Sequence, residues 1–162
     1  VEPSDIAGIQ KAVKLTIHEL KQFMDWAHRE SDEEQFLERI LSQRASYFRG
    51  EDYELALFDA KTNAFLVYSG FFPSVKINPS SFEIGFWTSA EHKGKGLATL
   101  ATRMQIALIF EYFKGDRIEI TCNLGNHASL RVIEKCGFLY EGELRNFYPK
   151  GTDEMLANGY VL

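Results

Sequence analysis

The sequence is poor in cysteine: its 162 residues contain two, Cys122 and Cys136. Two thiols are too few for a cysteine-based metal site, and a chain of this length does not need a disulfide to fold. We therefore expect no metal, reduced thiols and a cytoplasmic location. The sequence opens at Val1 without a methionine and without a signal-peptide pattern, and we expect that a first edge strand has been trimmed from its front.

A long apolar run and an excess of positive charge are also missing. The longest apolar run, 105–110, falls far short of the roughly 20 residues that cross a membrane. Eighteen Lys and Arg face 23 Asp and Glu, which gives a formal net charge of −5. Nucleic-acid binding needs clustered positive charge, so neither a membrane nor a nucleic acid is expected as a partner. The charge balance permits a basic substrate.

What is present is a globular composition, with 45% hydrophobic and 25% charged residues. Such a chain can bury a core, and its length suits one domain over 1–162. Apolar residues recur at helical spacing over 6–20, and a further turn or short helix is expected up to Trp26. Ser31 and Glu34 form a capping-box pattern for a second helix, which we expect to end at Gly50. Together with the strands described next, these helices predict an α/β fold class, with helices first and a mixed sheet later.

The period then changes to that of strands. Alternation predicts strands over 53–57, 65–72 and 81–88, and Gly85 within the third suggests a bulge or a close backbone approach. The remaining pattern predicts a helix over 97–113, a buried strand over 117–121, a short helix over 128–135, a strand over 138–148 and a last strand that ends at Leu162.

The segment with chemical information is 91–99, which links a strand to the long helix. Gly94 and Gly96 let the backbone bend close to a ligand, and the first amides of the helix lack intrahelical partners at the positive end of its dipole. Such a place attracts phosphate, to which Lys93 and Lys95 add charge. The loop does not match the dinucleotide pattern G-x-G-x-x-G, because Thr99 stands at the last position, nor does it match a P-loop.

Taken with later motifs, this loop is similar to that of a known family. Lys93-Gly94-Lys95-Gly96-Leu97-Ala98 resembles the acetyl-CoA pyrophosphate loop of the GNAT N-acetyltransferases, Q/R-x-x-G-x-G/A. Asn126-His127-Ala128-Ser129 and Glu134-Lys135-Cys136-Gly137-Phe138 resemble the N-x-x-S and E-K-x-G-F block of that superfamily. The runs 83–87 and 141–145 resemble its RimJ/RimL-like branch, the ribosomal-protein N-alpha-acetyltransferases.

The resemblance implies a GNAT fold, in which a twisted mixed sheet flanked by helices splays into a V between the strands near Trp87 and Thr121. It implies acetyl-CoA as co-substrate, lying in the V. The implied cofactor-binding residues are Phe86, Trp87, Thr88, Lys93, Gly94, Lys95, Gly96, Leu97, Ala98, Thr99, Asn126 and Ser129. The implied walls of the acceptor site are Trp26, Phe71, Phe72, Phe147 and Tyr148.

Two residues are candidates for catalysis. Glu83 is a carboxylate on an otherwise apolar strand, and it either acts as a base, through water, or pairs with an arginine. Ser129 either protonates the departing thiolate or caps the short helix. Many members of the superfamily carry a tyrosine acid where this chain has Ile133, and some relatives have a glutamate where it has Tyr148.

These observations predict direct transfer of an acetyl group to a primary amine, because no Ser-His or Cys-His nucleophile stands in a suitable context. The expected acceptor is a protein or peptide N-terminal amine, and the protein is expected to be a monomer or a homodimer. Two alternatives stay open. The acceptor could be a small amine such as a polyamine or an aminoglycoside, or the chain could be an inactive acyl-CoA-binding sensor.

Overall fold

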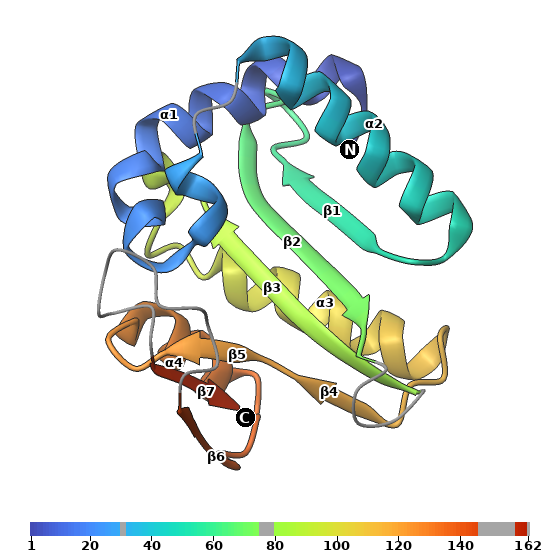
Figure 1. Ribbon diagram of the computed structural model, residues 1–162, viewed down its shortest axis with the longest axis vertical. Helices are drawn as coiled ribbons and strands as arrows, with labels where there is room; N and C mark the ends of the chain where they lie inside the picture. The colour runs from blue at the N-terminus through green and yellow to red at the C-terminus, as the bar shows by residue number, and fades with distance from the viewer. Residues whose placement is uncertain (30–31, 75–79, 146–157, 162) are drawn as a thin grey trace.

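The computed structural model describes residues 1–29, 32–74, 80–145 and 158–161. The helices and strands of these residues alternate in the second half of the chain, and Figure 1 shows their arrangement. In chain order they are η1 (Pro3–Asp5), α1 (Ile6–Phe23), η2 (Asp25–His28), α2 (Glu33–Arg49), β1 (Tyr53–Phe58), β2 (Phe65–Pro73), β3 (Ser81–Thr88), η3 (Ala90–His92), α3 (Leu97–Glu111), β4 (Arg117–Glu119), β5 (Thr121–Asn123), α4 (His127–Lys135), β6 (Gly142–Arg145) and β7 (Asn158–Val161).

The two N-terminal helices form where the apolar spacing places them, with one change at a cap. The side chain of Asp32 accepts a 2.8 Å hydrogen bond from the backbone N–H of Gln35, so Asp32 is the N-cap of α2 and the prediction of Ser31 was wrong by one residue. Gly50 ends the helix in the left-handed conformation, with φ 74°, as predicted. The apolar residues of α2 are unevenly buried, since Phe36 and Ile40 lie in the core while Phe48 is 74% exposed.

The strands form two sheets that part from one another. One has the order β1-β2-β3-β4 and the other the order β5-β7-β6. β3 pairs in parallel with β4 over three positions, from Ser81 opposite Arg117 to Glu83 opposite Glu119, and the pairing then stops. The strand predicted over 117–121 is therefore divided, with β4 in one sheet and β5 in the other. This divergence is the expected V.

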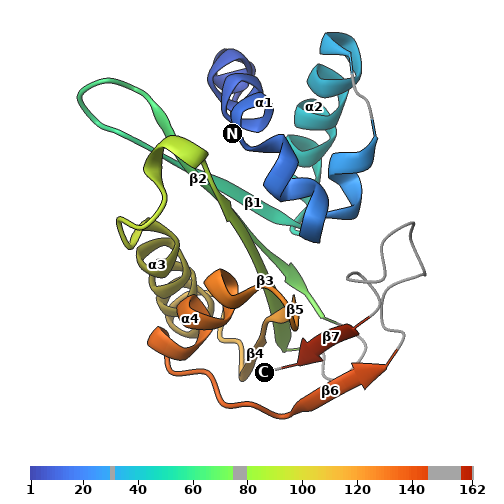
Figure 2. The same cartoon turned by 90° about the vertical axis from the view of Figure 1, so that its left-hand side faces the viewer.

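Apolar cores lie on both faces of the larger sheet (Figure 2). On one face α1, α2 and η2 pack against Phe65 and Trp87. On the other face the helices α3 and α4 cover Phe71, Ile84 and Ile120. The sheet thus holds a helical layer on each side, and the end of α1 comes close to the V.

Of the two alternatives for Gly85, a bulge or a close backbone approach, the structure excludes the first. The β2–β3 register is continuous from Val67 opposite Thr88 to Pro73 opposite Phe82, so β3 has no bulge at Gly85. The register shift instead occurs between Leu57 and Phe58 of β1. The strand predicted over 138–148 begins later, at Gly142, and its part beyond residue 145 lies outside the described residues. Over the described part of the chain, none of the helices combines the length and the apolar character of a membrane span.

Candidate functional site

The site begins at the N-terminus of α3, where two glycines shape the backbone. Gly94 and Gly96 have φ values of 72° and 76°, a region that L side chains rarely adopt. Gly96 is the N-cap of α3, and the first intrahelical bond runs from the N–H of Leu100 to its carbonyl oxygen at 3.0 Å. The amides of 97–99 therefore precede the first helical bond and stand at the positive end of the helix dipole.

A cavity of about 540 Å³ lies beside this helix end. It runs from the end of α1 along β3 and the 92–99 loop to the start of α4. With the exception of Lys95, every residue predicted to bind the cofactor lines it. The exposed ammonium of Lys95 instead lies 3.2 Å from the carbonyl oxygen of Glu91 and 3.2 Å from Nδ1 of His92.

Cations gather in this cavity although the chain as a whole is acidic. Arg131 and Lys135 stand one turn apart on α4 and both line it, as does Lys93. Lys93 forms an ion pair with Glu19 of α1, and burial lowers the pKa of the Lys93 ammonium. A hydrogen bond of 3.0 Å from the amide of Ala90 to Oγ1 of Thr16 fixes the same loop to α1. The cavity therefore suits an anionic ligand that spans from α3 to α4.

A second pocket, of about 160 Å³, shares part of its wall with the first. Glu83 and Ser129 both line it, so the structure brings the two candidate catalytic residues together. The shared wall consists of Phe23, Met24, Phe86, Asn126 and Ser129. A ligand group that passes this wall from the larger cavity reaches the carboxylate side of the V.

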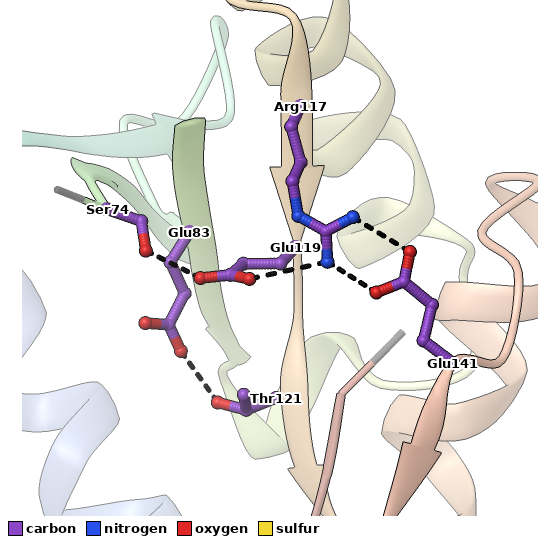
Figure 3. A network of polar contacts seen from close by, with 6 residues as sticks. All are labelled: Ser74, Glu83, Arg117, Glu119, Thr121 and Glu141. Atoms are coloured by element: carbon purple, nitrogen blue, oxygen red, sulfur yellow. Dashed lines mark hydrogen bonds and ion pairs between the residues drawn. The ribbon is translucent and has the colours of Figure 1, made fainter. Parts of the chain in front are cut away.

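Glu83 has a hydroxyl partner in place of the arginine considered above. Oγ1 of Thr121 donates a 2.6 Å hydrogen bond to Oε1 of Glu83 across the V (Figure 3). The side chain of Glu83 is half-buried and lines the small pocket. Among the described residues, the Thr121 hydroxyl is thus the hydrogen-bond partner of this carboxylate, which lies in the wall of the small pocket.

The arginine near the V pairs with other carboxylates. Glu119 is 6% exposed, and Oγ of Ser74 donates a 2.6 Å hydrogen bond to its Oε1. Arg117 lies 3.6 Å from Oε2 of Glu119 and binds Glu141 through two nitrogens (Figure 3). Glu141 raises the pKa of Arg117, and Arg117 holds the pKa of Glu141 below its ordinary value. This network joins β4 to the segment before β6, and the sequence patterns did not identify it.

The short helix α4 is capped by Asn126 and not by Ser129. Oδ1 of Asn126 accepts a 3.1 Å hydrogen bond from the backbone N–H of Ser129, so Ser129 contributes its amide to the cap. Ser129 is half-buried and lines both cavities. The capping alternative for the Ser129 side chain was therefore wrong, and its hydroxyl lies where the two cavities meet.

One protein family matches most of this chain. The family described as an acetyltransferase (GNAT) domain matches residues 1–139. This chain belongs to the GNAT family.

Solved structures share the fold of this GNAT chain over its whole length. A RimL ribosomal L7/L12 alpha-N-protein acetyltransferase in complex with coenzyme A has a TM-score of 0.84 at 19% identity, with 100% of this chain and 90% of that one covered. A ribosomal-protein-S5-alanine acetyltransferase from Vibrio fischeri has a TM-score of 0.84 at 16% identity, with 99% and 87% covered. These likenesses show the fold.

Curated relatives from Bacillus subtilis match shorter parts of the GNAT chain. YdaF, which is named as a candidate ribosomal N-acetyltransferase, is 42% identical over 76 residues, 46% of this chain and 42% of its own length. YjcK, a probable N-acetyltransferase, is 30% identical over 107 residues, 66% of this chain and 59% of its own. The chain thus matches about two-fifths to three-fifths of the length of these relatives.

The expected acceptor walls fit this GNAT structure poorly. Phe71 is 0% exposed and stacks on Tyr53 at 4.7 Å, so it belongs to the core below the sheet and cannot contact a substrate. Trp26 packs against Trp87 with ring centroids 6.2 Å apart and lines a groove between α1 and α2, outside both cavities. The prediction for Phe71 was wrong, because this aromatic residue of the sheet packs into the core. The acceptor role of Trp26 stays a prediction. Phe147 and Tyr148 lie outside the described residues.

The structure also places Ile133 and two site residues that no sequence pattern identified. Ile133, at the position of the superfamily's tyrosine acid, has no exposed area and packs in the core beneath α4. The sequence patterns did not identify Phe23 and Met24, which end α1 and line both cavities. No motif marks these two residues, since they enter the site only through the packing of α1 against the sheet.

Proposed function

We propose that this chain is an acetyl-CoA-dependent N-acetyltransferase whose acceptor is the N-terminal amine of a protein or peptide. One observation supports this proposal above the others: the cavity that starts at the N-terminus of α3 meets the pocket of Glu83 at Asn126 and Ser129. A long anionic co-substrate and an amine can therefore approach one another from two sides of the V. Membership of the GNAT family supports the same chemistry.

The residues present fit coenzyme A. Amides of the 97–99 turn offer donors to a pyrophosphate, and Lys93, Arg131 and Lys135 supply charge. The edge of β3 beyond Glu83 has no strand partner on the β4 side among the described residues, so its backbone is available to an amide-bearing arm. When bound, acetyl-CoA supplies an acetyl group activated as a thioester.

The chain's own residues then move the protons of the reaction. The acceptor arrives as an ammonium and loses one proton, which the Glu83 carboxylate receives directly or through one water. The free amine forms a new N–C bond to the acetyl carbon as the C–S bond breaks. The nitrogen then carries one proton too many for an amide and passes it to the oxygen of Ser129, or of a water beside it, as that hydroxyl gives its own proton to the departing sulfur. Glu83 returns the first proton to solvent, so both residues regain their starting protonation states.

The amine chemistry favours an N-terminal acceptor over a lysine side chain. An α-amine has a pKa of roughly 7.7–8.0 and a lysine amine one near 10.4. Deprotonation at pH 7 therefore costs about 1–1.4 kcal/mol for the first and about 4.6 kcal/mol for the second. A single half-buried carboxylate that also accepts a hydroxyl hydrogen bond is suited to the smaller task.

The relatives point to the same acceptor class. The RimL neighbour is named for acetylation of ribosomal L7/L12 at an alpha-amine, and the Vibrio fischeri neighbour for ribosomal protein S5. Both cysteines are unpaired, which fits the cytoplasm, where we place the enzyme. We treat 1–162 as one acetyltransferase domain.

Mass spectrometry of reaction products tests this proposal. The protein is incubated with acetyl-CoA and peptides that begin with Ser, Ala or Met, N-blocked lysine peptides, spermidine and an aminoglycoside. We expect acetylation of the free N-terminal peptides. Modification of spermidine or the aminoglycoside alone would assign a small-amine enzyme, and binding of acetyl-CoA without any product from a cell extract would indicate a sensor.

A further inference from the structure

One buried donor in the wall of the small pocket has no partner among the described residues. Asn123, on β5, is 7% exposed, and within the described part of the chain its buried Nδ2 has no hydrogen-bond partner. Oδ1 of the same amide is occupied, since it accepts a 2.8 Å hydrogen bond from the N–H of Gly125. An unpaired buried donor costs about 1–3 kcal/mol, so Nδ2 calls for a partner that the described residues do not supply.

The place of Asn123 indicates what that partner is. Asn123 lines the same 160 Å³ pocket as Glu83, Thr121 and Ser129. Side chains two residues apart on a strand point to the same face, so Asn123 lies on the face of Thr121, whose hydroxyl binds Glu83. Asn123 and Glu83 thus line one small space at the meeting point of the two cavities.

We propose that Asn123 is a specificity residue: its Nδ2 donates to the first carbonyl oxygen of an acceptor peptide while Glu83 binds the terminal ammonium. This inference rests on the proposed function and adds the group that recognises a peptide as such. An α-amine and its own carbonyl lie on one residue, so two contacts fix both the position and the direction of the chain end.

The dimensions of a strand and of a peptide agree with this role. Two residues along a strand cover about 6.6 Å, which separates the bases of Thr121 and Asn123. Three bonds join an amine nitrogen to the carbonyl oxygen of its residue, a reach of about 3 Å, and each hydrogen bond adds about 2.9 Å. A chain end with its two hydrogen bonds therefore covers a span of the same order as the separation of Asn123 from Thr121, the hydrogen-bond partner of Glu83.

The contact also gives a reason for selectivity. A polyamine or simple alkylamine satisfies Glu83 but leaves Nδ2 of Asn123 without a partner. A site with a buried polar group discriminates against ligands that cannot pair with it. Asn123 therefore favours peptides over amines that lack a carbonyl.

The test compares Asn123→Asp with the unchanged protein. The aspartate keeps the acceptor for the Gly125 amide and replaces the Nδ2 donor by an oxygen. Substrates are a peptide that begins with Ala and isopropylamine, which has the same amine and methyl group without the carbonyl. Effects on the ammonium influence both substrates, so the ratio of their kcat/KM values isolates the carbonyl contact. Asn63→Asp, in an exposed turn, makes the same charge change as a control.

We expect Asn123→Asp to lower kcat/KM for the peptide at least about tenfold more than kcat/KM for isopropylamine, with the Kd of acetyl-CoA unchanged. An unchanged peptide value overturns the inference, as does a parallel loss for the peptide, isopropylamine and acetyl-CoA binding. If the unchanged protein acetylates neither amine while it binds acetyl-CoA, the proposed function fails, and the inference that rests on it is withdrawn.

Discussion

Gly96 shows how a single residue can serve the ligand more than the fold. Its φ is 76°, and a Cβ built there would meet no atom within 4 Å. Gly137 has the same property, with φ 85° and open space around it, but it does not line the large cavity. We expect Gly96→Leu and Gly137→Leu to lower the free energy of unfolding by a similar amount, about 1–2 kcal/mol, which is the penalty for a residue with a side chain in the left-handed backbone conformation.

Acetyl-CoA binding should separate these two variants. A side chain at position 96 occupies the space beside the α3 amides, so calorimetry should show at least a tenfold weaker Kd for Gly96→Leu and an unchanged Kd for Gly137→Leu. Tight binding by the first variant would contradict the assignment of the loop.

Glu83 has a role that its pH dependence can reveal. Glu83→Gln keeps an acceptor for the Thr121 hydroxyl but cannot take a proton. We expect its turnover to fall about 10²-fold or more, and most strongly at low pH, where less of the acceptor amine is already deprotonated. The measurement is kcat/KM from pH 6 to 9. A profile parallel to that of the unchanged protein would remove Glu83 as the base.

At the scale of elements, α4 depends on its cap. Asn126 caps this nine-residue helix, and Asp32 caps the longer α2 in the same way. Replacing either by Ala should lower the free energy of unfolding by about 1 kcal/mol. Chemical denaturation measures this change for both variants.

The same two variants differ in their distance from the ligand. The start of α4 lines both cavities, whereas Asp32 lies in the groove between α1 and α2. We therefore expect Asn126→Ala alone to weaken acetyl-CoA binding. An equal loss of affinity in Asp32→Ala would show that general destabilisation is the cause.

Local sequence patterns predict some elements of this fold and miss others. The helix and strand positions that follow a strong period, and the glycine loop before α3, could be predicted, because local spacing and backbone conformation determine them. The division of 117–121 between two sheets could not, because the partner of each strand lies far away in the sequence. The family resemblance placed Phe71 at the acceptor site, but it does not tell which face of this strand packs into the core.

At the scale of the whole molecule, the half-buried acid Glu54 couples stability to pH. Glu54 lies on β1, where Tyr68 donates a hydrogen bond to it and Gln43 of α2 in turn donates to the Tyr68 oxygen at 3.3 Å. Burial raises the pKa of Glu54 from 4.5 to about 7. An acid with a raised pKa favours folding fully below its unfolded pKa, and this advantage is lost between about pH 4.5 and 7 as the charge forms.

Glu54→Gln removes this dependence and keeps an acceptor for Tyr68. We expect the variant to match the unchanged protein near pH 4.5 and to exceed its free energy of unfolding by up to about 3 kcal/mol at pH 8. Urea denaturation at several pH values measures the difference. A difference that stays constant between pH 4.5 and 7 would show that folding does not raise the pKa of Glu54.

The parting of β3 from β4 has a consequence for handling the protein. Over the described residues, β3 has no strand partner on that side beyond Glu83, so Ile84–Thr88 present free backbone donors and acceptors as an open edge. Open edges recruit strands from other molecules and start aggregation. Light scattering during slow heating should therefore show turbidity at a higher temperature when coenzyme A is present. The ligand that the V accommodates would then also protect the purified protein from aggregation in storage.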